Sequence, residues 1–482
     1  MKHFMKRSQF IKLAMLLFYT SACANKNPEE SKNTDKIKNT PVTTTAAVAD
    51  TFRPGKVITH VFCKADTAQS YALYIPANGN HEALPVIYFF DPHGDGSYPL
   101  SKYKALADIY NFILIGSNNS KNGNDLSTSE NIWSILSDDS KERLKINTNR
   151  IYTCGFSGGA KVAGYVGLNH HEVKGVIANG AGLPEKTPLS NFNFSFTAIA
   201  GEGDMNMTDL VAMSNDLDNT QTRHRIIFFD GKHEWAPENT MNIAFAGLQF
   251  DAMYEKLIPV DDAFINNYIA GSKKKVDVYL KTNSYIKAKA ECKLSISLLD
   301  GLTNDVNWFK EKDASFKNNT VYQKQLQTEQ HLLVTEQNWK AIYMQQFQRG
   351  DMNYWDKTIR DLQTRAKTRT AEGAMYQRLL AFLSLAFYSI SNQLITGKQD
   401  NKEVEHFVDL YKMADSTNSE AWYFSAILNA RNNNAKATEE DLLKAVEYGF
   451  TDKARMMQQA EFKNPPAQIN FTKIESKMKK KE

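Results

Sequence analysis

The pattern of apolar and polar positions divides the chain into two parts of different character. From residue 52 to about residue 258, short apolar runs alternate with segments of helical period. Most of these runs are continuously apolar, which is typical of strands in a parallel sheet with helices on both faces. The predicted strands are 57–63, 71–75, 84–90, 112–115, 151–154, 173–178, 194–200 and 225–229. The predicted helices are 103–110, 131–144, a segment after residue 157, 208–217 and 236–257.

Strand patterns stop after Pro259, and nearly all of the remaining chain has helical period. We therefore predict an α/β domain over residues 52–258 and an all-helical domain over residues 259–482. The strongly apolar helix at 375–390 contains Arg378, and we interpret it as a buried bundle helix instead of a membrane span. Residues 414–449 resemble a tetratricopeptide-type helical pair. An irregular helical bundle is an equally good interpretation of that segment.

The first 22 residues have the pattern of a targeting segment. A basic stretch precedes an apolar core at 13–19 and the small residues Thr20-Ser21-Ala22. This order is typical of a signal peptide, and the core is too short to span a membrane. Because Cys23 follows the small residues, the segment resembles a bacterial lipobox, which implies cleavage before Cys23 and lipidation of its thiol. An ordinary secretory signal with an incidental cysteine is the alternative.

Residues 23–51 are polar and nearly free of large apolar side chains, so we predict a flexible tether. Acyl chains on Cys23 would hold the protein at a membrane surface of the bacterial cell envelope. We expect the outer membrane, and Glu29-Glu30 weakly resembles a surface-export signal. The face of the membrane is left open.

Composition narrows the classes of function. The 482 residues carry a formal net charge of only +4, which gives no reason to expect a nucleic-acid partner. Cys63, Cys154 and Cys292 are odd in number and far apart, so we expect no disulfide framework. No Cys, His or carboxylate cluster has metal-ligand spacing, and no glycine-rich loop suits a phosphate. We therefore expect neither a metal nor a cofactor.

The candidate nucleophile is Ser157, in Gly155-Phe-Ser-Gly-Gly159 between a predicted strand and a predicted helix. A nucleophile elbow needs a sharp strand–turn–helix with Gly on both sides of the Ser, because a Cβ there would clash. Chance alone supplies this spacing in about one chain in ten. Its position between strand and helix makes the motif informative.

A serine nucleophile needs a histidine base and an acid that orients the base. Asp204 lies in the glycine-rich loop after strand 194–200, and His233 lies in the loop after strand 225–229. The order Ser, acid, His, each after a separate strand, is the order expected for this kind of sheet. Glu202 and Asp209 are competing acids, and Asp204 is preferred because Gly203 gives its loop room to turn.

An oxyanion hole is the remaining requirement. We expect one donor from the backbone N–H of Gly158, at the start of the helix after the nucleophile. The second is expected from the His93-Gly94 loop, with Gly94 as the donor. His93, Asn118 and Trp235 are predicted to contact substrate, although Asn118 lies in a segment that could equally be a turn.

Residues 52–257 resemble the α/β-hydrolase superfamily, close to secreted esterases of the polyhydroxybutyrate-depolymerase and feruloyl-esterase kind. The resemblance rests on the elbow at 155–159, on His93-Gly94, on Asp204 and on Gly231-Lys-His-Glu-Trp235. It implies acylation of Ser157 followed by hydrolysis with water activated by His233. Residues 259–482 lie outside the resemblance.

The predicted function is hydrolysis of carboxylic esters, such as acyl or feruloyl groups on glycans, or polyesters. Only residues 180–193 separate the strand after the elbow helix from the next strand. That length leaves little room for a lid, so we expect an open site suited to bulky esters. Two alternatives are a serine peptidase with the same triad, and a non-catalytic envelope protein that binds a protein partner through its helical domain.

Overall fold

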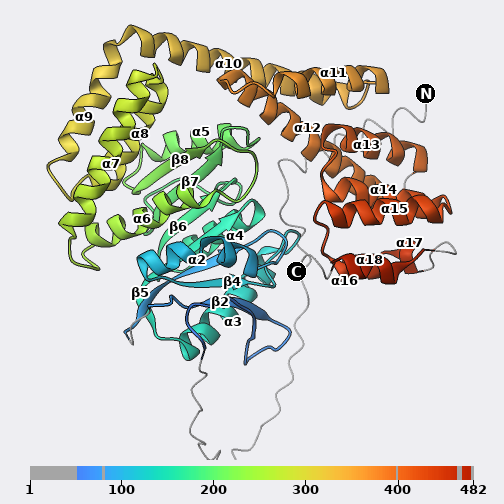
Figure 1. Ribbon diagram of the computed structural model, residues 1–482, viewed down its shortest axis with the longest axis horizontal. Helices are drawn as coiled ribbons and strands as arrows, with labels where there is room; N and C mark the ends of the chain where they lie inside the picture. The colour runs from blue at the N-terminus through green and yellow to red at the C-terminus, as the bar shows by residue number, and fades with distance from the viewer. Residues whose placement is uncertain (1–51, 79–81, 398–399, 464–468, 479–482) are drawn as a thin grey trace, which may run out of the picture.

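An eight-stranded sheet forms the centre of the N-terminal half (Figure 1). The computed structural model describes residues 52–78, 82–397, 400–463 and 469–478, so the predicted signal peptide, Cys23 and the tether lie outside the described residues. The strands are β1 (Ile58–Phe62), β2 (Ser70–Tyr74), β3 (Leu84–Phe90), β4 (Ile113–Ser117), β5 (Ile146–Phe156), β6 (Val173–Asn179), β7 (Ser195–Gly201) and β8 (His224–Phe229).

The strand order is β1-β2-β4-β3-β5-β6-β7-β8. β1 pairs with β2 and β2 with β4 in antiparallel fashion, and every other neighbouring pair is parallel. This arrangement, with an all-helical region after it, confirms the predicted fold class of an α/β-hydrolase sheet.

Helices cover both faces of the sheet because its strands bury side chains on both sides. In β3, Ile87 and Phe89 belong to one hydrophobic core, whereas Val86, Tyr88 and Phe90 belong to the other. The first face is covered by α2 (Ser97–Tyr110) and α6 (Glu238–Tyr254). The second is covered by α3 (Leu126–Arg143), α4 (Gly158–Asn169) and α5 (Met207–Leu217).

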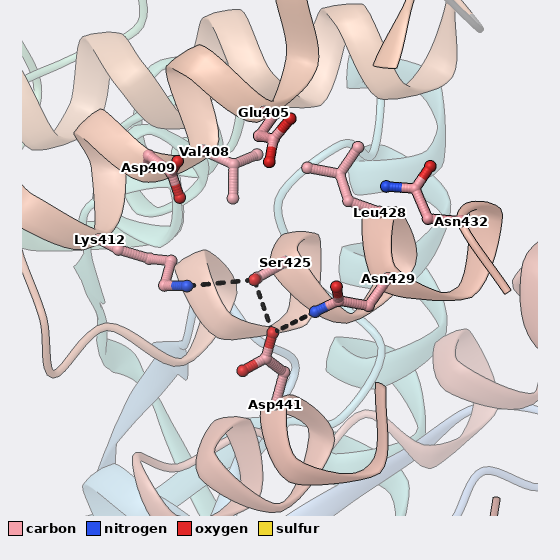
Figure 2. A pocket seen from close by; sticks show the side chains of 9 residues that line it. All are labelled: Glu405, Val408, Asp409, Lys412, Ser425, Leu428, Asn429, Asn432 and Asp441. Carbon is pink, nitrogen blue, oxygen red and sulfur yellow. Dashed lines mark hydrogen bonds between the residues drawn. The ribbon is translucent and has the colours of Figure 1, made fainter. Parts of the chain in front are cut away.

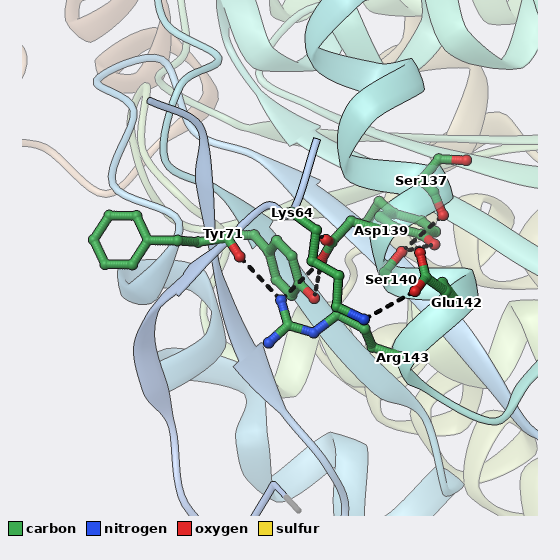
Figure 3. A network of polar contacts seen from close by, with 9 residues as sticks. Lys64, Tyr71, Ser137, Asp139, Ser140, Glu142 and Arg143 are labelled. Carbon is green, nitrogen blue, oxygen red and sulfur yellow. Dashed lines mark hydrogen bonds and ion pairs between the residues drawn. The ribbon is translucent and has the colours of Figure 1, made fainter. Parts of the chain in front are cut away.

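A buried polar network fixes the outer strands to α3 (Figure 3). The Asp139 carboxylate accepts hydrogen bonds from the Lys64 backbone N–H at 2.7 Å, the Tyr71 hydroxyl at 2.9 Å and Arg143 Nη1 at 3.1 Å. Burial and the adjacent Asp139 charge raise the pKa of Tyr71, which keeps its hydroxyl a donor. Each buried polar group of the network therefore has a partner.

The described chain after α6 contains helices only. They are α7 (Asp262–Lys281), α8 (Tyr285–Leu299), α9 (Val306–Ser315), the 3-10 helix η1 (Phe316–Asn318), α10 (Thr320–Gln346), α11 (Met352–Arg365), α12 (Ala371–Thr396), α13 (Asn401–Ala414), α14 (Ser419–Arg431), α15 (Ala435–Glu447), α16 (Lys453–Gln458), α17 (Ala460–Lys463) and α18 (Phe471–Met478). By length and composition α12 is the one helix in the described ranges that could cross a membrane. Its apolar residues Met375, Leu379 and Leu383 are buried among neighbouring helices.

The helical part is divided between two hydrophobic cores. Apolar residues of α7, α8 and α9, such as Ile269, Leu298 and Phe309, join the core on the α6 face of the sheet. A separate core begins at Tyr343 in α10 and extends to Met478 in α18. The change of core therefore falls within the long helix α10, well after the last strand.

Candidate active site

The backbone at Ser157 has the strained geometry that a nucleophile elbow requires. β5 ends at Phe156 and α4 begins at Gly158, with Ser157 between them at φ 53° and ψ −120°. A Cβ at Gly155 would collide with the Gly159 carbonyl, and a Cβ at Gly159 would collide with the Phe90 carbonyl of β3. Glycine at both positions is what allows strand and helix to approach this closely.

Three residues after three different strands meet at this turn. The Ser157 hydroxyl lies 2.9 Å from His233 Nε2. On the other side of the ring, His233 Nδ1 lies 3.0 Å from Asp204 Oδ2 and 3.1 Å from Oδ1. Asp204 is fully buried, whereas the His233 side chain is 20% exposed. This is the connectivity of a nucleophile, a base and an orienting acid.

Two side-chain amides hold the loops that carry the acid and the base. Asn179, at the end of β6, accepts the Ala236 backbone N–H at 2.7 Å and donates to the Glu234 carbonyl at 3.2 Å. Asn206 donates to the Gly180 carbonyl at 2.8 Å, and its own N–H donates to Asp204 Oδ1 at 2.9 Å. These contacts fix both loops against the turn after β6.

The two competing acids lie elsewhere. Glu202 pairs with Lys287 of α8 at 2.8 Å, which directs its carboxylate away from the histidine. Asp209 is on the exposed side of α5. Of the three candidate acids, the structure brings only Asp204 to His233.

Of the two N–H donors predicted for the oxyanion hole, Gly158 lies where expected and Gly94 does not. Gly158 is the first residue of α4, where the N–H groups of the first turn have no partner within the helix. The Gly94 N–H, in contrast, donates to the Asp91 carbonyl at 3.1 Å in a turn with φ +77°. It is engaged within its own loop and is not directed at Ser157. The side chain of Asn122 lies directly against Gly158.

Trp235 and Asn118 are placed as supports for the site. Trp235 is 5% exposed and donates its indole N–H to Asp91 Oδ2 at 2.8 Å, instead of lying on the surface as a substrate contact would. Asn118 donates to the Thr59 carbonyl and to Ser70 Oγ, both at 3.0 Å, and accepts from the Gly96 N–H. Both side chains therefore brace neighbouring loops.

His93 lies in the loop after β3, and its side chain is 80% exposed. Its hydrogen bond to Asp91 raises the pKa of His93 above the ordinary 6.5, and the carboxylates of Asp91, Glu420 and Asp95 act in the same direction. Glu420 belongs to α14, so the charge of a C-terminal helix contributes to the raised pKa of His93. Burial opposes ionisation of Asp91, but hydrogen bonds from His93 and Trp235 hold its pKa below 3.8.

Sequence reasoning missed the residues that hold the triad in place. Asn179 is the last residue of β6, and Asn206 lies in the loop after β7. Polar side chains at the carboxyl ends of parallel strands can indicate a functional site. Asp91 directly follows β3 and could have been found by the same signal. Gln377 and Arg378 of α12 contact the loop of Asp204, and no signal in the sequence indicated this.

A pocket lies in the helical region, between α13, α14 and α15 (Figure 2). This cavity of about 280 Å³ is lined by polar residues, including Glu405, Asp409 and Asp441. Asp441 Oδ2 accepts from Ser425 at 2.6 Å and Asn429 at 2.9 Å, and Lys412 donates to Ser425 at 3.2 Å. The pocket contains none of the residues predicted for the active site.

No protein-family model matches the chain, and no curated protein matches it. Among solved structures, an esterase from the hyperthermophilic archaeon Pyrobaculum calidifontis is similar at 12% identity and TM-score 0.34, covering 52% of this chain and 92% of its own. A ferulic acid esterase is similar at 14% identity and TM-score 0.33, covering 41% and 97%. One of two fungal esterases from Rhizomucor miehei is similar at 15% identity and TM-score 0.35, covering 42% and 85%.

Proposed function

We propose that this protein is a serine hydrolase that cleaves carboxylic esters, with Ser157 as nucleophile, His233 as base and Asp204 as orienting acid. The single observation that carries the proposal is the continuous hydrogen-bonded path from Ser157 Oγ through His233 to Asp204, with links of 2.9 Å and 3.0 Å. A strained backbone at Ser157 adds support, because such strain is maintained where function needs it.

In the first step, Ser157 Oγ attacks the ester carbonyl carbon while its proton passes to His233 Nε2. The negative charge on the carbonyl oxygen faces the N-terminal end of α4, where the Gly158 N–H and the helix dipole stabilise it. When the tetrahedral intermediate collapses, His233 returns the proton to the leaving alcohol and an acyl-Ser157 ester remains.

In the second step, His233 takes a proton from water, and the hydroxide attacks the acyl carbon. The tetrahedral intermediate then collapses and releases the carboxylic acid, while His233 returns the proton to Ser157 Oγ. Asp204 acts throughout by holding His233 Nδ1–H, so that Nε2 faces the nucleophile. Its full burial and its hydrogen bond from the Asn206 N–H support this positioning role.

We infer that the site is open and suits bulky substrates such as acylated or feruloylated glycans or polyesters. The segment between β6 and β7, residues 180–194, contains no helix or strand that could form a lid. The exposed His93 ring is the remaining predicted contact for such a substrate. Lipidation of Cys23 and attachment to the bacterial envelope complete the proposal, with the hydrolase carried on the tether of residues 23–51.

The experiment is hydrolysis of p-nitrophenyl acetate by the wild-type protein and by Ser157→Ala, His233→Ala and Asp204→Asn. We expect Ser157→Ala to lower kcat by at least about 10³-fold, because removing the nucleophile ends covalent catalysis. Equal rates for the wild type and Ser157→Ala would contradict the proposal. Acetylated and feruloylated glycans, compared with peptide amides of similar size, then separate an esterase from a peptidase.

A further inference from the structure

The loop that carries Asp204 is held from outside by helices of the C-terminal half. Arg378 Nη1 of α12 donates to the Glu202 backbone carbonyl at 2.7 Å. Lys287 of α8 pairs with the Glu202 carboxylate at 2.8 Å. The side chain of Gln377, next to Arg378, lies so close to Gly203 that a Cβ there would collide with it. Three side chains from two helices thus contact the two residues that precede Asp204.

Arg378 is itself fixed in direction. Its side chain is 5% exposed, and Glu336 of α10, which is fully buried, accepts from Arg378 Nε at 2.8 Å and Nη2 at 2.7 Å. Lys340, one turn further along α10, lies 2.8 Å from the other oxygen of Glu336. A planar guanidinium held on two nitrogens by one carboxylate has little freedom to turn, so its remaining nitrogen points at a defined place.

The place it points to is connected directly to the triad. The Gly203 N–H donates to the Gly231 carbonyl at 2.9 Å, which joins the acid loop to the loop of His233. The Asp204 N–H donates to the Gly201 carbonyl at 3.0 Å, so the Glu202-Gly203 turn sets where the acid lies. A shift of the Glu202 carbonyl would therefore move the Asp204 carboxylate relative to His233 Nδ1.

We propose that Arg378, oriented by Glu336, is a positioning residue that holds Asp204 in place for catalysis. The helical region thereby completes the active site of the α/β part, although it supplies none of the reacting groups. This inference rests on the proposed function. It goes beyond that function by assigning a task in catalysis to the helical core that begins at Tyr343 in α10.

The test compares Arg378→Met with a matched control, Arg431→Met. Arg431 of α14 has the same kind of contacts, pairing with Glu461 at 2.7 Å and donating to the Ile395 carbonyl at 2.9 Å, but none of them touches the acid loop. We expect Arg378→Met to lower kcat for p-nitrophenyl acetate by between about 10-fold and 100-fold with KM little changed, since a misplaced catalytic group affects the rate more than binding. Arg431→Met should leave kcat and KM unchanged. Arg378→Lys should have a kcat between that of the wild type and that of Arg378→Met.

A double-mutant cycle separates positioning from a general loss of stability. If Arg378 acts through Asp204, then adding Arg378→Met to Asp204→Asn should lower kcat by less than about twofold further. Full additivity of the two losses would overturn the proposal, because it would mean that Arg378 acts independently of the acid.

Hydrogen exchange of the acid loop tests the same contact without any substrate. We expect the amides of residues 202–204 to exchange faster in Arg378→Met than in the wild type and in Arg431→Met. Unchanged exchange would contradict the positioning role even if the protein is an active esterase. Faster exchange in a protein that does not hydrolyse esters would instead contradict the proposed function and leave the contact to the loop intact.

Discussion

At the scale of single residues, the site depends on positions where a side chain would occupy the wrong space. Gly180, the first residue after β6, has φ +69°. A Cβ at this position would lie 3.2 Å from both Asp204 Oδ2 and His233 Cε1, and 2.9 Å from the Phe156 ring. The sequence marked Gly180 only as the start of a short loop, because neither its backbone angle nor its neighbours can be read from composition.

We expect Gly180→Ala to lower kcat by about 10- to 100-fold, because the added methyl group displaces the acid and the base from each other. Gly449→Ala is the control: its φ of +107° is also unfavourable for alanine, but nothing lies within 4 Å of the new Cβ. Both variants should lose about 1–2 kcal/mol of unfolding free energy from backbone strain. Steady-state kinetics and thermal unfolding check the two effects, and equal activity in the two variants would contradict the explanation.

At the scale of elements, the apolar pattern predicted every strand of the sheet, but not how the strands and helices are joined. The Asp251 carboxylate of α6 accepts from Arg225 Nη2 of β8 at 2.6 Å and from Arg223 Nε at 2.7 Å. Arg223 also donates to the Leu298 carbonyl of α8 at 2.7 Å. A strand, the closing helix and the helical region thus share one buried charge cluster, which no local sequence signal could predict.

We expect Asp251→Ala to lower the free energy of unfolding by about 3–5 kcal/mol, because it leaves the fully buried Arg225 without its partner. Asp356→Ala provides the comparison, since Asp356 pairs with Arg360 on an exposed helix surface and should cost less than about 1 kcal/mol. Urea denaturation of both variants measures the difference. Similar losses would show that the cluster contributes no more than a surface ion pair.

At the scale of the whole molecule, the sequence predicted the fold class and placed Ser157, Asp204 and His233, in that order, each after a separate strand. Such predictions are possible because strand ends and turn residues are local features. It could not locate Arg378, whose partner Glu202 lies 176 positions away. It also could not show that α7, α8 and α9 share a core with the sheet, since a helical period is the same whatever the helix packs against. Packing decides which distant segments are in contact. The predicted boundary at residue 258 marks only the point where strand patterns stop, and the change of hydrophobic core comes later, within α10.

The division of the cores leads to a prediction about shortened proteins. A chain ending at residue 258 would expose the apolar surface of α6 and β8 that α7, α8 and α9 now cover, so we expect it to aggregate or to unfold at a markedly lower temperature.

A chain ending at residue 330 keeps that core, including Tyr322 and Leu326 of α10, and should remain soluble and fold cooperatively. It lacks Glu336 and Arg378, however, so its kcat for p-nitrophenyl acetate should fall at least as far as that of Arg378→Met. Expression yield, thermal unfolding and kinetics on the two shortened chains separate stability from positioning. Full activity in the chain ending at residue 330 would mean that the second helical core has no part in holding Asp204.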